Sequence, residues 1–252
     1  MEMFIGLLKG YWMKTKPEII ANCKILLKAY QEGKLGQTVM PEDSPPKFSN
    51  HEENLAYFTL PMALNYQRDS YKLWEAALRT FNENKEVFNV NCNLSEEELR
   101  EILVRTKVAL QPNKHIATWR TISKTISENW SSITKLLEAA DNDYLKLREL
   151  LQIKHKKGFP YLSGPKIFNY WCFILTQYCN VQLKNSEFIE IAPDTHVTKC
   201  SILLGVIDDE NLLKEQISAK WREILSGFRI TPIEMHPPLW FWSRNGFLFK
   251  LD

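Results

Sequence analysis

The sequence predicts an all-α protein, on three observations. Apolar residues recur at helical spacing in about ten segments of the chain. Most of these segments begin with a capping residue or with a proline suited to the first turn of a helix. No convincing run of alternating polar and apolar residues marks a strand. With 252 residues, the chain has room for one large domain or two small ones.

The first elements follow from their caps and their periodicity. A helix begins after Thr15, with Pro17 in its first turn and an apolar face from Ile19 to Tyr30. The stretch 33–50 is rich in glycine and proline and predicts a loop. The next helices have their own signals. An apolar pattern follows His51, Asp69 or Ser70 can cap a second helix, and Ser95 with Glu98 forms a capping box for a third. Further helices are expected after Pro112–Asn113, over 133–140, and from Asp143 to Ile153.

The C-terminal part of the chain reads in the same way. Pro165 suits the first turn of a helix, and Asp194 can cap another. Asp208 or Asp209 can cap a helix over 212–224 that ends at Gly227. The tail 231–252 is rich in proline and tryptophan and has no clear period.

Composition excludes several classes of protein. The chain is 44% hydrophobic and 25% charged, and its formal charge of +2 gives no whole-molecule field for an anionic partner. The five cysteines form no CxxC pair, which predicts reduced, mostly buried thiols and neither a disulfide framework nor a zinc or iron–sulfur site. No apolar run approaches the ~18 residues of a spanning helix. The apolar stretch 1–14 is interpreted as a structural segment, because it lacks a basic leader and a cleavage site.

A basic hairpin, residues 154–166, has the sequence KHKKGFPYLSGPK and lies between two helical patterns. Gly158 and Gly164 allow tight backbone turns. The amides that follow Gly164 point out of a helix N-terminus, and Lys156 and Lys157 add positive charge. This arrangement could hold a phosphodiester backbone without reading its sequence. The alternative is a glycine-containing turn with a solvated lysine cluster.

Together with the residues that flank it, the hairpin resembles a known family of proteins. Gly164-Pro165-Lys166 is similar to the Gly-x-Lys step that ends the hairpin of the helix-hairpin-helix DNA glycosylases. The run 191–197, Ile-Ala-Pro-Asp-Thr-His-Val, resembles the apolar run and Asp-Thr/Val-His-Val of the same superfamily. Weaker matches lie at 58–67 and 113–120, so the resemblance covers roughly residues 52–207. It departs from the family where Leu162 replaces the usual first glycine of the hairpin.

The resemblance implies a pair of catalytic residues. Lys166 would attack the sugar C1′ as an amine nucleophile, and Asp194 would stabilise the positive charge that develops on the sugar. A lysine nucleophile implies a bifunctional enzyme, a glycosylase that also cleaves the strand by β-elimination. The plainer alternatives are a phosphate contact for Lys166 and only a helix cap for Asp194. No cofactor and no metal are expected.

DNA and base contacts are assigned from the same resemblance and from local spacing. Tyr170 lies one helical turn after Lys166, and the tail that carries Trp240 can fold back over the cleft. Core packing is the alternative for both aromatic residues. His196 is expected to make a structural hydrogen bond. The expected DNA-binding residues are Lys156, Lys157, Gly158, Leu162, Gly164 and Gln67, and the expected base-pocket residues are Tyr170, Trp240 and Asn65.

The expected activity is removal of an oxidised base from DNA, and 8-oxoguanine is the first candidate for that base. A lysine nucleophile argues against the alkyladenine enzymes, and the missing cysteines argue against the endonuclease III branch. The long spacing from Lys166 to Asp194 resembles the archaeal 8-oxoguanine enzymes. Another damaged or mismatched base, or a non-catalytic DNA-binding module, remain as alternatives.

The resemblance also implies two helical subdomains with the active-site cleft between them. The expected subdomains are 1–69 with 186–252, and 70–185 with the helix-hairpin-helix at about 150–172. The expected protein is a monomer that binds damaged double-stranded DNA in the cytoplasm and nucleoid, or in a nucleus, and not a membrane.

Overall fold

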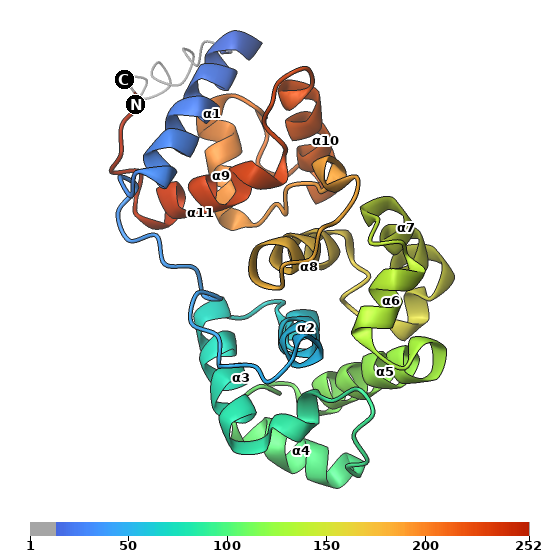
Figure 1. The fold of residues 1–252 in the computed structure, drawn as a ribbon. Helices are drawn as coiled ribbons and strands as arrows, with labels where there is room; N and C mark the ends of the chain where they lie inside the picture. Colours follow the sequence, from blue (N-terminus) through green and yellow to red (C-terminus); the bar gives the residue numbers. More distant parts are fainter. Residues whose placement is uncertain (1–13, 252) are drawn as a thin grey trace, which may run out of the picture. The chain divides into compact units, whose positions relative to one another are not determined.

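A computed structural model describes residues 14–251 of the chain, and over these residues the protein is helical (Figure 1). The described part contains eleven α-helices, short 3-10 turns and one π-helical turn. It contains no strand, and the only β-type pairing within it is an isolated bridge between Asp143 and Lys184. The predicted all-α class is therefore confirmed. The predicted structural segment 1–14 lies, except for Lys14, outside the described residues.

Contacts along the chain divide it into two compact units. Unit 1 comprises Met1–Thr38 and Pro193–Asp252, and unit 2 comprises Val39–Ala192. The sequence-based division instead placed 39–69 and 186–192 with the terminal segments. The helix that starts at His51 packs against α6 (Ile133–Ala139) and α8 (Pro165–Tyr178) of unit 2. The turn Ser186–Phe188 packs against α7 (Tyr144–Glu149) of the same unit.

Unit 1 is built from helices at both ends of the chain, α1 (Lys16–Gln31), α9 (Thr195–Leu204), α10 (Lys214–Leu225) and α11 (His236–Arg244). Figure 1 shows α1 beside α11, and α11 in turn packs on α9. The predicted start of α1 is confirmed, because Glu18 accepts hydrogen bonds from the backbone and the hydroxyl of Thr15. Its buried face includes Ile19, Cys23 and Leu26.

One prediction for unit 1 is wrong. Neither Asp208 nor Asp209 caps α10, because Asp209 accepts from the Asn211 amide in a local turn and the helix begins only at Lys214. The tail 231–252, in which the sequence shows no clear period, forms the 3-10 turn η6 (Ile233–Met235) and then α11. The prolines of α11 occupy its first turn, where a missing N–H costs no helical hydrogen bond.

Unit 2 contains seven α-helices in chain order. They are α2 (His51–Thr59), α3 (Ser70–Asn84), α4 (Glu96–Arg105), α5 (Pro112–Trp130), α6 (Ile133–Ala139), α7 (Tyr144–Glu149) and α8 (Pro165–Tyr178). The predicted caps at Asp69, Ser95 and Asp143 are confirmed, each accepting from backbone amides at the start of its helix. The core includes a cluster of aromatic side chains, in which Tyr57 packs against both Phe58 and Trp74.

The connection from α2 to α3 positions residues of the weaker motif at 58–67. α2 ends at Thr59, and a 3-10 turn, η1 (Met62–Leu64), follows Pro61. η1 packs against α5 and α8 within unit 2. The chain then turns at Gln67, whose φ of 50° is in the left-handed region.

The prediction of free, mostly buried thiols is confirmed. All five thiols are free, and only Cys92 is not fully buried. Burial raises the pKa of the Cys23 and Cys179 thiols to about 12, so these thiols stay protonated and unreactive. No helix among residues 14–251 is long and apolar enough to cross a membrane.

Candidate functional site

The hairpin is a compact series of turns between α7 and α8. A π-helical turn, Leu150–Lys154, extends α7, and a 3-10 turn, Lys156–Gly158, follows it. The turn then closes on itself, because the Ser163 amide donates to the Phe159 carbonyl at 2.9 Å and the Gly164 amide donates to the Tyr161 carbonyl at 2.9 Å. α8 begins immediately afterwards at Pro165, in the first turn as predicted.

Both hairpin glycines lie in tight turns as expected, since the Gly158 amide donates to the His155 carbonyl at 2.7 Å and the Gly164 amide to the Tyr161 carbonyl. Neither glycine has a positive φ. Gly164 has an ordinary φ of −67°. A Cβ on Gly158 would lie 2.5 Å from Thr125 Cγ2, so this glycine permits close contact with α5. The left-handed position of the hairpin is instead Tyr161, with φ 60°.

The structure limits the expected DNA contact of Leu162 to its backbone. Leu162 is 0% exposed, so its side chain belongs to the core of unit 2. The residue in the glycine-like conformation is its neighbour Tyr161, which is 39% exposed. Lys156 and Lys157 are also exposed, and they remain candidates for phosphate contacts.

Lys166 is the second residue of α8 and is half-buried. At this end of a helix the first backbone N–H groups lack helical acceptors and the peptide dipoles leave a partial positive charge. A phosphate placed there would meet these amides together with Lys156 and Lys157 of the hairpin. The first turn of α8 thus combines an amine with an anion-binding backbone.

Tyr170, predicted for the base pocket, lies beside a buried acid that the sequence did not point out. Its hydroxyl donates to Glu42 Oε1 at 3.1 Å, and Trp74 Nε1 donates to the same oxygen at 2.7 Å. Glu42 is 2% exposed, and its Oε2 is buried without a donor from another described residue. Burial raises the pKa of Glu42 to about 7, although the bonds from Trp74 and Tyr170 oppose the shift.

Asn65 and Gln67 flank an aromatic residue that reaches the hairpin. Asn65 Oδ1 accepts from Ser70 Oγ at 3.0 Å, and Gln67 is exposed. Between them, Tyr66 stacks on Tyr161 with ring centroids 4.1 Å apart. Tyr66 also meets the ring of His115 in α5, at 5.6 Å. The two weaker motif segments and the hairpin are therefore in contact within unit 2.

Asp194 opens α9 in unit 1 as predicted. Its Oδ1 accepts a hydrogen bond from the Val197 amide at 2.9 Å, so the cap engages one of its two carboxylate oxygens. The predicted structural hydrogen bond of His196 is present, from Nδ1 to Ser243 Oγ at 3.0 Å. Burial lowers the pKa of His196 below its ordinary value, which favours the neutral ring at pH 7.

Trp240, the third base-pocket candidate, contacts the same turn of α9. Its ring lies 5.6 Å from the ring of His196, and the Arg244 guanidinium lies 5.0 Å from its centroid. Trp240 is half-buried, so part of its surface is open. His196 of unit 1 thus contacts the ring of Trp240 and senses the charge of Asp194.

A buried asparagine holds the end of the long segment that precedes Asp194. The Glu190 amide donates to Asn169 Oδ1 at 3.0 Å, and the Tyr144 hydroxyl donates to the same oxygen at 2.8 Å. Asn169 follows Lys166 by less than one turn of α8, and Glu190 precedes Asp194 by four residues. Sequence reasoning missed this contact, as it missed Glu42 and Tyr66, because no local pattern marks it.

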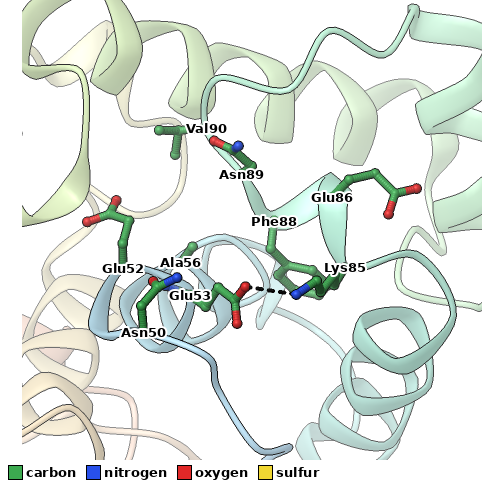
Figure 2. Close-up of a pocket in the computed structure, with 9 residues that line it drawn as sticks. All are labelled: Asn50, Glu52, Glu53, Ala56, Lys85, Glu86, Phe88, Asn89 and Val90. Atoms are coloured by element: carbon green, nitrogen blue, oxygen red, sulfur yellow. Dashed lines mark hydrogen bonds and ion pairs between the residues drawn. The ribbon is translucent and has the colours of Figure 1, made fainter.

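A surface cavity of about 400 Å³ in unit 2 involves none of the predicted residues, and Figure 2 draws the side chains that line it. Two of its three acidic side chains have structural partners. Glu53 pairs with Lys85 at 3.1 Å, and Glu52 accepts from the Ile133 and Thr134 amides at the start of α6. We therefore assign this cavity no chemistry.

Comparison with models of known protein families found no match for this chain. A search of curated proteins found no similar sequence.

Proposed function

We propose that this chain is a helix-hairpin-helix DNA glycosylase with AP-lyase activity. It removes an oxidised base from double-stranded DNA, and 8-oxoguanine is the first candidate for that base. The observation that carries the proposal is the position of the two motif residues. Lys166 lies in the first turn of α8 directly after the basic hairpin, and Asp194 is the N-cap of α9. A nucleophile and a carboxylate at two helix starts are what this chemistry requires.

In the proposed reaction, Lys166 Nζ forms a bond to the sugar C1′ while the bond from C1′ to the base breaks. The electron pair of the broken bond leaves with the base, which takes up a proton. One amine proton goes to the leaving base. The C1′–O4′ bond then breaks with its electron pair on O4′, which takes the second amine proton, and a Schiff base remains between Nζ and C1′. Removal of a C2′ proton then expels the 3′ phosphate with its electron pair. Asp194 stabilises the positive charge on the sugar during the first step.

The contact between Asn169 and Glu190 lies close in sequence to both proposed catalytic residues. Asp194 follows Glu190 by only four residues, and each residue of an extended chain spans at most about 3.6 Å. The hydrogen bond at Asn169 therefore fixes one end of a short tether that leads to Asp194. The proposal requires that both side chains act on the same sugar.

Base recognition would use groups that both units contain. A flipped base needs an aromatic face and a few polar partners. Tyr170 and Trp240 can supply the aromatic faces. Glu42 adds a buried carboxyl beside Tyr170, and its raised pKa allows it to donate as well as accept hydrogen bonds near neutral pH.

Borohydride trapping tests the proposal directly. The protein is incubated with a duplex that contains 8-oxoguanine, and borohydride reduces any Schiff base to a stable amine. We expect a covalent protein–DNA adduct that Lys166→Gln abolishes. Lys135→Gln, which changes an exposed lysine on α6, is the matched control and should form the adduct as the unchanged protein does.

The other outcomes distinguish the alternatives. An adduct with an oxidised pyrimidine or a mismatched base, but not with 8-oxoguanine, would keep the mechanism and change the substrate. Tight, salt-sensitive duplex binding without any adduct would favour a non-catalytic DNA-binding protein. Neither adduct nor binding would refute the proposal.

A further inference from the structure

We infer that Tyr161, backed by Tyr66, is a stacking platform for an unpaired base of the DNA duplex. The inference rests on the proposed function and extends it, because it assigns a DNA contact that the catalytic motifs do not contain. The platform would take the base left without a partner when the damaged base is removed from the stack. Base stacking on an aromatic ring does not depend on base identity, so this contact would not itself read sequence.

The geometry of the two rings is that of a stack. The centroids of Tyr66 and Tyr161 lie 4.1 Å apart, and the ring planes differ by 14°. The ring of Tyr66 also makes an edge-type contact with the ring of His115 in α5, with centroids 5.6 Å apart. One face of Tyr161 is thus supported, while the residue as a whole stays 39% exposed.

The backbone conformation at position 161 is unfavourable for a tyrosine. Its φ of 60° is left-handed, which glycine adopts readily and a bulky aromatic residue adopts rarely. The neighbouring turn at Gln67 is also left-handed, with φ 50°. Strained positions of this kind persist where the surrounding structure over-determines them, and they cluster at functional sites.

Charge around the platform suits a nucleic acid. Lys156 and Lys157 are exposed on the same hairpin, and the Ser163 hydroxyl donates to the Lys156 carbonyl, which ties the lysine turn to the segment after Tyr161. The N-terminus of α8 follows within four residues. An exposed aromatic ring between cationic groups is the arrangement that binds bases and backbone of unpaired nucleotides.

The alternative is a purely structural role, in which Tyr161 only covers Tyr66. Tyr161→Gly separates the two roles, because glycine relieves the left-handed strain and removes the ring. Tyr161→Phe keeps the ring and serves as the matched control. Each protein is measured for binding to a fully paired duplex and to a duplex with a tetrahydrofuran abasic analogue opposite 2-aminopurine, whose fluorescence reports stacking.

The unchanged protein and Tyr161→Phe should bind the abasic duplex more tightly than the paired one and alter the 2-aminopurine signal. Tyr161→Gly should weaken binding to the abasic duplex about tenfold, within the range known for base–aromatic stacking, and leave binding to the paired duplex nearly unchanged. It should also lose the fluorescence change. Circular dichroism and the melting temperature establish that the variant is folded.

Equal affinity of Tyr161→Gly and the unchanged protein for the abasic duplex would overturn the inference, as would equal losses on both duplexes. Borohydride trapping separates this failure from failure of the proposed function. Trapping without an effect of Tyr161→Gly refutes the platform alone. Selective loss of abasic binding without trapping by any protein refutes the glycosylase and keeps the platform. Absence of DNA binding by the unchanged protein refutes both.

Discussion

Asn169 and Glu190 are joined by a hydrogen bond of 3.0 Å from the Glu190 backbone amide to Asn169 Oδ1. The side-chain nitrogen of Asn169, Nδ2, donates to the Pro165 carbonyl at 2.8 Å. This bond fixes the orientation of the side chain in the first turns of α8. The long segment after α8 therefore returns to the helix that carries Lys166. Asp194 follows four residues after that anchor.

Asn169→Leu should destabilise the protein and slow adduct formation. Asn169 is 4% exposed, and the substitution would leave the Glu190 amide and the Tyr144 hydroxyl without their acceptor. Buried groups that lose a partner in this way cost about 1–3 kcal/mol each. Urea unfolding measures the loss of stability, and trapping of a single turnover measures the rate.

Tyr144→Phe is the control for this experiment, since it removes one donor to Asn169 and leaves the Glu190 contact. It should cost about 1 kcal/mol and should change the trapping rate little. A trapping rate that falls equally in both variants would contradict a specific role of the anchor at Glu190.

Asp194→Asn should separate the cap from the chemistry. An asparagine side chain also accepts from the Val197 amide and is as good an N-cap as aspartate, so the melting temperature should stay nearly unchanged. The negative charge that stabilises the developing positive charge is lost, and base release should slow about 10²–10³-fold. Single-turnover kinetics on 8-oxoguanine duplex measure this effect. Unchanged kinetics would leave Asp194 with its structural role alone.

The pH dependence of stability should carry the signature of Glu42. Its pKa is about 7 in the folded protein against 4.5 for an ordinary glutamate, so the folded state holds a proton that the unfolded chain has released. The free energy of unfolding should therefore fall as pH rises from 4.5 to 7 and level off above that, with a contribution of at most about 3 kcal/mol.

Glu42→Gln removes this titration and keeps an oxygen acceptor for Trp74 and Tyr170. The variant should match the unchanged protein near pH 5 and exceed its stability at pH 8 by about 1–3 kcal/mol. Urea unfolding at the two pH values provides the comparison. Parallel pH profiles of the two proteins would show that Glu42 ionises normally.

The sequence predicts this fold well where the deciding interactions are local. Ser95 and Asp194 cap their helices through bonds to amides three residues away, so their signals are readable from the chain alone. The contact between Glu42 and Trp74 joins residues 32 positions apart and depends on packing that no local pattern encodes. α11 was missed for a different reason, because its prolines are typical of loops as well as of first turns.

The same distinction applies to the candidate site. The positions of Lys166 and Asp194 at helix starts follow from Pro165 and from the capping preference of aspartate. Tyr161 could not be identified in this way, since its exposure, its left-handed backbone and its stacking on Tyr66 exist only in the folded unit.

Gly158→Ala should test how the hairpin is seated on α5. The added Cβ would lie 2.5 Å from Thr125 Cγ2 and 2.6 Å from Thr125 Oγ1, which is closer than real Cβ contacts allow. Overpacking of this kind costs about 1–3 kcal/mol, and it would displace the hairpin with Lys156 and Lys157. Both the melting temperature and the affinity for duplex DNA should therefore fall.

Thr125→Ala supplies the compensating change, because it removes both atoms that meet the new Cβ and costs only the hydrogen bond from Thr125 Oγ1 to the Thr121 carbonyl. The double variant should recover most of the stability and DNA affinity that Gly158→Ala loses, with a coupling energy of about 1 kcal/mol or more in a double-mutant cycle. Additive losses would mean that the hairpin is held elsewhere. Recovery of stability without recovery of affinity would mean that Gly158 meets the DNA itself, since the alanine methyl then blocks a phosphate whose approach the glycine permits.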